Sequence, residues 1–240
     1  MHFSERVRSA FRRGDDHAVV RMSEAEIERA RAAGDAAGEV EARYSLARVA
    51  IRDGDLREGE SRARTALEVA LRSGDRSLEE RPRHVLAAIA RMSGELTRAV
   101  ELYRESIALN EALGRPETVN SEYHNLAFCE LGLGHVDTAR QLFAEGRARV
   151  FAHGWADFVP YVCLAGAALA AAEQDYARAA RLIGVTEVAF AELGQVPDPD
   201  DAKDLSLVRA LALDALGPDE FAREHAHGEL LDPRAAFTQE

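Results

Sequence analysis

The apolar positions of this chain are filled mainly by alanine and leucine, and no window shows a sustained alternation of apolar and polar residues. Alanine and leucine favour helix, whereas the β-branched and aromatic residues that favour strands are few. A strand with one exposed face would show a period of two residues. The pattern therefore predicts an all-α protein.

Glycine recurs at a fixed interval of 40 residues, in two series that are offset by 20. The first series comprises Gly14, Gly54, Gly94 and Gly134, and its next step falls on Gln174. The second series comprises Gly34, Gly74, Gly114, Gly154 and Gly194. Helices commonly end at a residue in the left-handed conformation, which glycine adopts without a steric penalty. Each glycine therefore predicts a helix end, and two helices of about 15 residues form a hairpin in each period.

Acidic residues follow many of these turns, namely Asp15, Asp35, Asp55, Asp75, Glu95 and Asp175. The free N–H groups and the positive dipole at the start of a helix favour a carboxylate at that place. We therefore expect these residues to cap the helices that follow them.

Alanines hold fixed places relative to the first glycine series. Five residues after its members lie Ala99, Ala139 and Ala179, and seven residues before them lie Ala47, Ala87, Ala127 and Ala167. Small side chains let two helix axes approach closely, so these alanines are expected at helix contacts.

These positions resemble the tetratricopeptide repeat, over about residues 4–193. The clearest copy comprises Leu126, Ala127, Gly134, Ala139, Phe143 and Gly146, and a second comprises Leu86, Ala87, Ala90, Gly94, Ala99, Tyr103 and Ser106. The resemblance implies a right-handed superhelical solenoid of antiparallel helix hairpins that binds a partner. The period of 40 residues exceeds the roughly 34 residues usual in this family, so longer helices are expected.

Residues 1–194 are expected to form the repeat array, with hairpins at about 1–34, 35–74, 75–114, 115–154 and 155–194. Residues 195–204 hold two prolines and four aspartates and are interpreted as a loop. Helices are expected at about 202–216 and 219–227. Because terminal repeats are often atypical, residues 195–240 are interpreted as capping helices of the same domain.

Three C-terminal segments carry a second resemblance, namely residues 179–184, 216–221 and 232–237. They are similar to the C-terminal helical regions of bacterial regulators of the LuxR-like and SARP-like types. This resemblance implies a role in bacterial regulatory signalling.

Charge and composition exclude several functions. The net charge of −12 disfavours direct nucleic-acid binding. No apolar leader or membrane-length apolar stretch is present, which predicts a cytoplasmic protein without a membrane role. Cys129 and Cys163 have no metal-ligand spacing, and His84 and His124 lack a carboxylate or cysteine partner in the sequence pattern. No phosphate loop, dinucleotide motif or nucleophile elbow appears, so neither a metal, a cofactor nor an enzymatic activity is expected.

In the family that the repeats resemble, the first helix of each hairpin lines the concave surface. The resemblance therefore assigns twelve partner-binding positions: Tyr44, Arg48, Arg52, Arg81, His84, Arg91, His124, Asn125, Phe128, Leu131, Tyr161 and Leu164. The earlier positions are rich in arginine and the later ones are apolar. Because arginine pairs well with carboxylates, we expect a protein or peptide partner with acidic and apolar segments.

Other interpretations remain open at this stage. The arginines could instead pair with Glu and Asp of neighbouring helices, which is usual for surface charges. Tyr44, Arg48, His84 and Asn125 could hold a small inducer of a transcriptional regulator. The first hairpin or the last helices could mediate self-assembly, so the protein is expected to be a monomer or a homodimer.

Overall fold

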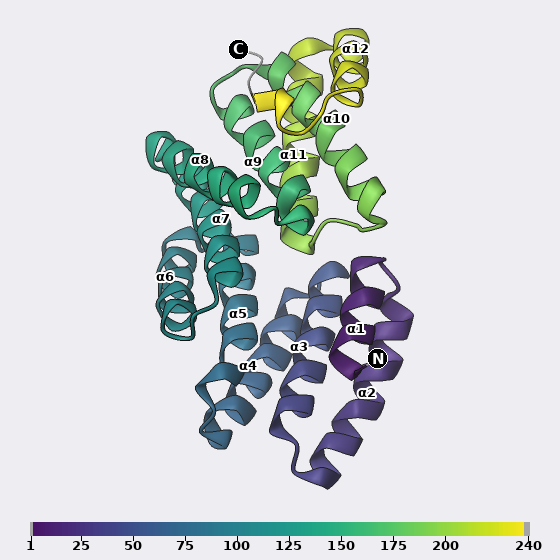
Figure 1. Ribbon diagram of the computed structural model, residues 1–240, viewed down its shortest axis with the longest axis vertical. Coiled ribbons are helices and arrows are strands. Elements are labelled where there is room, and N and C mark those ends of the chain that lie inside the picture. Colours follow the sequence, from purple (N-terminus) through teal and green to yellow (C-terminus); the bar gives the residue numbers. More distant parts are fainter. Residues whose placement is uncertain (1, 238–240) are drawn as a thin grey trace. The chain divides into compact units, whose positions relative to one another are not determined.

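The computed structural model describes residues 2–237, and within that range every regular element is a helix (Figure 1). The prediction of an all-α protein is confirmed. The chain divides into two compact units, Met1–Glu122 and Tyr123–Glu240, which we call the N-terminal and the C-terminal unit. Each unit is described by itself below.

The N-terminal unit stacks three helical hairpins, α1/α2, α3/α4 and α5/α6, followed by the first turns of α7 (Figure 1). The helices are α1 (Phe3–Arg12), α2 (Asp16–Ala33), α3 (Ala36–Arg52), α4 (Leu56–Ser73), α5 (Glu80–Met92), α6 (Leu96–Ala112) and α7 (Pro116–Gly132). A single 3₁₀ turn, Arg76–Leu78, precedes α5. Among the first helices of the hairpins, α1 contacts α3 and α3 contacts α5.

The C-terminal unit contains the rest of α7 and five further helices. They are α8 (Val136–His153), α9 (Val159–Ala172), α10 (Tyr176–Leu193), α11 (Pro199–Leu216) and α12 (Pro218–Gly228). The 3₁₀ turns Ala156–Phe158 and Ala235–Phe237 precede α9 and follow α12. α9 and α10 form a hairpin, α11 packs against both of them, and α12 packs mainly against α10.

The turn positions predicted from glycine are confirmed. Every member of both glycine series has a positive φ, between 61° and 84°. Gln174 also has a positive φ, of 65°, and it is the one non-glycine residue among those described to do so. The chain therefore keeps the left-handed turn even where glycine is missing, because the packing of α9 against α10 outweighs the steric cost.

The capping prediction holds for most of the acidic residues. The carboxylates of Asp15, Asp35, Asp55 and Asp175 each accept a hydrogen bond from a backbone N–H in the first turn of the next helix, and Asp75 caps the 3₁₀ turn. Glu95 occupies the cap position of α6 but makes no such bond. Its carboxylate pairs with Arg98 at 2.7 Å instead, because the longer glutamate side chain reaches past the first N–H groups.

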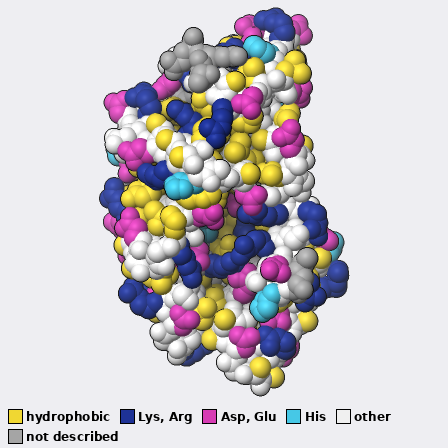
Figure 2. Space-filling model, viewed as in Figure 1, with side chains coloured by type: hydrophobic (Ala, Val, Ile, Leu, Met, Phe, Trp, Pro, Cys, Tyr) yellow, Lys and Arg dark blue, Asp and Glu magenta, His cyan; other side chains and the backbone are white. Residues whose placement is uncertain are grey.

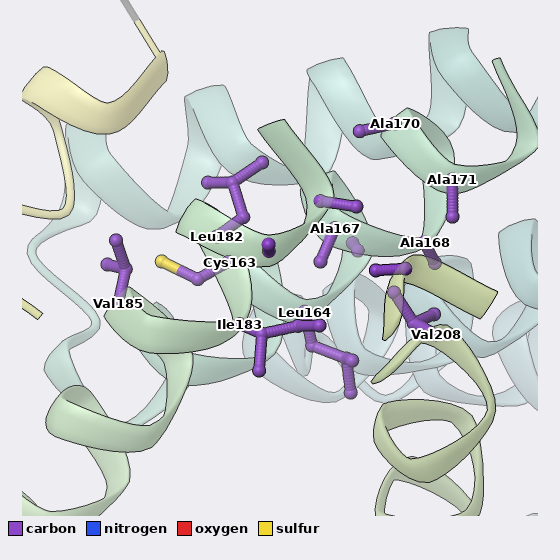
Figure 3. Packing of buried hydrophobic residues seen from close by; sticks show 14 of the residues in the cluster. Cys163, Leu164, Ala167, Ala168, Ala170, Ala171, Leu182, Ile183, Val185 and Val208 are labelled. Carbon is purple, nitrogen blue, oxygen red and sulfur yellow. The ribbon is translucent and has the colours of Figure 1, made fainter. Parts of the chain in front are cut away.

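Small residues lie where the helices touch, as predicted. Ala99, Ala139 and Ala179 have no exposed surface. In the C-terminal unit one continuous core joins α9, α10 and α11, with Leu164, Ile183 and Val208 near its centre (Figure 3).

The loop predicted at residues 195–204 is shorter than expected. α11 begins at Pro199, three residues before the expected start at residue 202. Proline at the first helical position has its φ already set for helix, and the carboxylates of Asp200 and Asp201 lie in the first turn. The helix expected at about 219–227 is present as α12.

Candidate partner-binding surface

The N-terminal unit places six of the predicted partner-binding residues on two neighbouring helices. Tyr44, Arg48 and Arg52 lie on α3, and Arg81, His84 and Arg91 lie on α5. Arg91 is buried, whereas the other five are half-buried. These five residues therefore sit at the surface of the stacked first helices with part of each side chain held by the protein.

Arginines and aromatic rings alternate on this surface. The guanidinium carbons of Arg48 and Arg52 both lie 3.7 Å from the centre of the Phe11 ring. The guanidinium of Arg48 lies 5.5 Å, and that of Arg81 5.2 Å, from the centre of the Tyr44 ring. A cation within about 6 Å of a ring face is attracted by the ring quadrupole. We call Phe11, Tyr44, Arg48, Arg52 and Arg81 the arginine–aromatic cluster.

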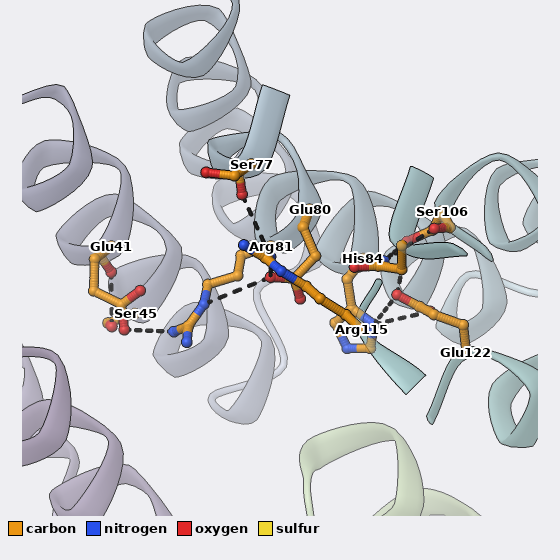
Figure 4. Close-up of polar contacts among 10 residues, drawn as sticks. Glu41, Ser45, Ser77, Glu80, Arg81, His84, Ser106, Arg115 and Glu122 are labelled. Atoms are coloured by element: carbon orange, nitrogen blue, oxygen red, sulfur yellow. Dashed lines mark hydrogen bonds and ion pairs between the residues drawn. The ribbon is translucent and has the colours of Figure 1, made fainter. Parts of the chain in front are cut away.

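Two arginines of the cluster pair with carboxylates of the preceding hairpin. Arg52 donates to Asp16 at 2.6 Å and to the carbonyl oxygen of Phe11 at 3.1 Å. Arg81 donates to Glu41 at 2.5 Å, which Figure 4 shows as a link from α5 to α3. Pairing with neighbouring helices, one of the interpretations left open by the sequence, therefore describes Arg52 and Arg81.

Burial sets the electrostatics of the Glu41–Arg81 pair. Burial raises the pKa of Glu41, and the attraction of Arg81, Arg8 and Arg48 only partly offsets this effect. For Arg81 burial acts to lower the pKa, but the neighbouring Tyr44 and Glu41 raise it overall. The arginines thus keep their charge, whereas burial makes the Glu41 carboxylate easier to protonate.

His84 belongs to a second network, around the buried carboxylate of Glu122. Glu122 has no exposed surface and contacts His84 Nδ1 at 3.1 Å through either oxygen. Ser106 donates its hydroxyl to Glu122 at 2.7 Å, and Asn110 donates to the carbonyl oxygen of Ser106 at 2.9 Å. Figure 4 shows His84, Ser106 and Glu122 converging from α5, α6 and α7. This network joins three helices, so its first role is structural.

Glu122 was not predicted as a site residue, although the repeat contained a signal for it. Glu122 lies twelve residues before Gly134, at the position that Ala42 and Pro82 hold in the two preceding hairpins. Both of these residues are buried. A glutamate at a buried repeat position predicts a buried polar network, because an isolated carboxylate is costly there.

The C-terminal unit brings three of the predicted residues together through their rings. His124 lies 5.0 Å from Phe128 and 6.1 Å from Tyr161, measured between ring centres. His124 Nε2 also contacts the buried carboxylate of Asp201 at 3.2 Å, which ties α7 to the start of α11. Asp201 was interpreted as part of a loop, and its buried place in the first turn of α11 corrects that interpretation.

The remaining three predicted residues of this unit are Asn125, Leu131 and Leu164. Leu164 is fully buried in the core beside Val208 of α11, so it serves that core and not an exposed binding row (Figure 3). Asn125 is buried as well, and Leu131 is half-buried against the core. The apolar part of the predicted binding row is therefore mostly interior in this unit.

Candidate chemistry of other kinds is limited in the described residues. No group of three or more His, Cys, Asp or Glu side chains between residues 2 and 237 is arranged to hold a metal ion. Burial raises the pKa of the Cys163 thiol to about 12, so the thiol stays protonated and unreactive near neutral pH. Among the described helices, none is both long and apolar enough to cross a membrane.

Ion pairing extends beyond the arginine–aromatic cluster. On the face of the molecule drawn in Figure 2, basic and acidic side chains lie beside one another, with hydrophobic side chains between them. Arg43 pairs with Glu39 at 2.7 Å and Arg115 with Glu80 at 2.9 Å. These pairs are partly buried as well, so the cluster is distinguished from them by the aromatic rings under its arginines.

Comparison with known proteins finds a family match for one segment of the chain. Residues 38–112, which run from α3 to the end of α6, match the tetratricopeptide repeat family. This segment contains Tyr44, Arg48, Arg52 and Arg81 of the cluster. No curated protein matches the sequence.

Two solved structures show the same fold. BtubC (BKLC) from P. vanneervenii is 21% identical, with 94% of this chain and 93% of that chain covered and a TM-score of 0.60. A Rap protein, solved in complex with Competence and Sporulation Factor, is 15% identical, with 99% of this chain and 72% of that chain covered and a TM-score of 0.67. At these identities the likeness establishes a helical repeat solenoid of the tetratricopeptide type.

Proposed function

We propose that this protein is a non-catalytic binding module for a protein or peptide, and that the arginine–aromatic cluster is its contact surface. The observation that carries the proposal is the position of Arg48. Its guanidinium is stacked on Phe11 and lies near Tyr44, on the first helix of a hairpin within the matched repeats. A guanidinium held in this way loses little conformational entropy when a carboxylate binds to it.

The chemistry of the cluster favours a partner that carries both acidic and apolar segments. Arginine recognises carboxylates with two parallel hydrogen bonds. The exposed part of the Tyr44 ring offers an apolar contact beside them. The same fold in the Rap protein was solved with Competence and Sporulation Factor bound, which supports the use of such repeats for binding. The sequence resemblance to bacterial regulators supports a role in cytoplasmic regulatory signalling.

A peptide titration tests the proposed surface. Fluorescein-labelled helical peptides with Glu/Asp on one face and Leu/Phe on the other would be titrated against the wild type and Arg48→Glu. We expect Arg48→Glu to weaken binding at least about tenfold, because a desolvated charge pair becomes a repulsion. Equal affinity of the two proteins would overturn the proposal.

Arg72→Glu is the matched control. Arg72 is exposed on α4, and its contact with Glu68 is 3.9 Å long. Arg72→Glu changes the net charge by the same amount as Arg48→Glu. If a long-range effect of charge reduced the affinity, both variants would therefore bind the peptides equally weakly. Isolation of the partner from the native host, with Arg48→Glu as the negative control, would then test the regulatory role.

A further inference from the structure

α11 is apolar on two faces, and only one of them is used within the unit. Val208 and Ala212 are buried against the core formed with α9 and α10. Leu207 and Leu211 are 58% and 45% exposed. They are four residues apart, so they lie next to each other on the side of the helix that faces away from that core. An exposed pair of large apolar side chains on a regular helix is typical of a helix-pairing surface.

Two opposite charges flank this leucine pair. Lys203 and Asp214 lie four residues before Leu207 and three residues after Leu211, so all four side chains share one side of α11. Lys203 is the only lysine in the sequence. We call Lys203, Leu207, Leu211 and Asp214 the α11 face. It is positive at its N-terminal end, apolar in the middle and negative at its C-terminal end.

This order of charges is complementary to itself when the helix is reversed. If two copies of α11 pair antiparallel about a two-fold axis between residues 208 and 209, Lys203 of each copy meets Asp214 of the other. The same axis brings Leu207 of one copy beside Leu211 of the other, at the centre. A two-fold interface requires this property, because each patch must fit its own copy. Parallel pairing would instead bring the two Lys203 side chains together.

We propose that the α11 face pairs antiparallel with the α11 face of a second copy of this chain. The chain carries a net charge of −12, so the two copies repel each other over distance. A contact of one helix with another is also smaller than the roughly 1,200–2,000 Å² of stable interfaces. The dimer is therefore weak, with a dissociation constant in the micromolar range or above, and its population rises with concentration and with salt.

Sedimentation velocity over roughly micromolar to millimolar concentrations tests the pairing. The wild type should shift from monomer to dimer, and Leu207→Glu together with Leu211→Glu should abolish the shift. Leu71→Glu is the control for a glutamate placed at an exposed leucine elsewhere, since Leu71 is 53% exposed on α4 of the N-terminal unit. Unchanged circular dichroism and melting temperature would show that each variant is folded.

The single lysine allows a second, residue-specific test. A carbodiimide joins a lysine amine to a carboxylate as an amide, and mass spectrometry of mixed ¹⁴N and ¹⁵N protein identifies links between copies. We expect a Lys203–Asp214 link between copies, and we expect Lys203→Arg to remove it while leaving the dimer seen by sedimentation. A monomer at all concentrations would overturn the proposal. A dimer that survives both leucine substitutions, or lacks this link, would overturn it too.

Discussion

α3 of the N-terminal unit and α9 of the C-terminal unit hold the same place in the repeat but differ in character. Tyr44 and Arg48 on α3 are half-buried, whereas the corresponding Leu164 and Ala168 on α9 are buried. α11 covers these α9 residues through Val208 and Ala212, in the same core. The half-buried positions of α3 carry an arginine and a tyrosine, whereas the covered positions of α9 are apolar, because burial of an unpaired charge is costly.

The helix contacts of the C-terminal unit are closer as well. A Cβ atom on Gly184 would lie 2.3 Å from the carbonyl oxygen of His225, and one on Gly228 would lie 1.9 Å from that of Arg181. α10 and α12 thus meet backbone to backbone. Glu187 of α10 accepts from His225 of α12 at 2.9 Å beside this crossing. The α10–α12 contact of the C-terminal unit therefore requires glycine at the crossing, whereas the surface of α3 in the N-terminal unit is distinguished by its arginines.

The largest effect is expected from Gly228→Ala. The added methyl group would collide with backbone that cannot move aside as a side chain can. We expect the C-terminal unit to lose about 3 kcal/mol of unfolding free energy, the upper end of the usual range for over-packing. Trp155, the only tryptophan, lies in this unit and reports its unfolding in urea. Ala222→Ser, at an exposed site of α12, is the control and should change little.

Ala99→Leu and Ala139→Leu compare helix contacts in the two units. Each alanine is fully buried, so the larger side chain should cost roughly 1–3 kcal/mol. Circular dichroism should detect both losses. Ala108→Leu, at an exposed site of α6, should be almost neutral. Wild-type stability in both buried variants would contradict the assigned repeat positions.

Removal of a helix cap should have an intermediate effect. Asp35→Ala deletes the carboxylate that accepts from the Gly38 N–H at 2.9 Å, and it should cost about 1 kcal/mol in thermal unfolding. Asp175→Ala should act alike in the other unit, since Asp175 makes the same contact with Arg178. Glu95→Ala is the control, because Glu95 makes no cap bond. A loss from Glu95→Ala as large as that from Asp35→Ala would contradict the capping argument.

Gln174→Gly should increase stability. Gln174 has a φ of 65° in the conformation that every other turn of the two series gives to glycine. The relief of strain exceeds the entropy that glycine adds to the unfolded chain, for a net gain of up to about 1 kcal/mol. The reverse change, Gly134→Gln, should lower stability by a similar amount. Urea unfolding measures both changes. A loss of stability in Gln174→Gly, or a gain in Gly134→Gln, would contradict the argument from backbone strain.

The smallest effect is expected from the protonation of Asp35 at low pH. The backbone N–H of Gly38 and then the side chain of Arg29 lower the pKa of Asp35 below 3.8. Its contribution to folding is therefore present above about pH 3.8 and is lost as the pH falls through the lower folded pKa. Asp35→Asn keeps an oxygen that can cap α3 but does not titrate. Its stability should fall less steeply than that of the wild type below pH 3.8, and identical profiles would contradict this assignment.

Interactions that follow the repeat could be predicted from the sequence. Glu41 and Arg81 lie thirteen residues before Gly54 and Gly94, so neighbouring hairpins place them side by side. The contact of His124 with Asp201 could not be predicted, because Asp201 lies beyond the last repeat glycine. Outside the repeat, no fixed spacing relates one helix to the next.

The sequence by itself determined the helices, their turns and the small residues between them. Glycine spacing, capping carboxylates and alanine positions are local signals, and each acts through neighbouring backbone. Only the tertiary structure decided which face of each helix stays exposed. Leu164 on α9 is buried, because α11 covers that side of α9. Leu207 on α11 is exposed, because no described helix covers the outer side of α11. Burial depends on what packs against a helix, and that partner is distant in the sequence.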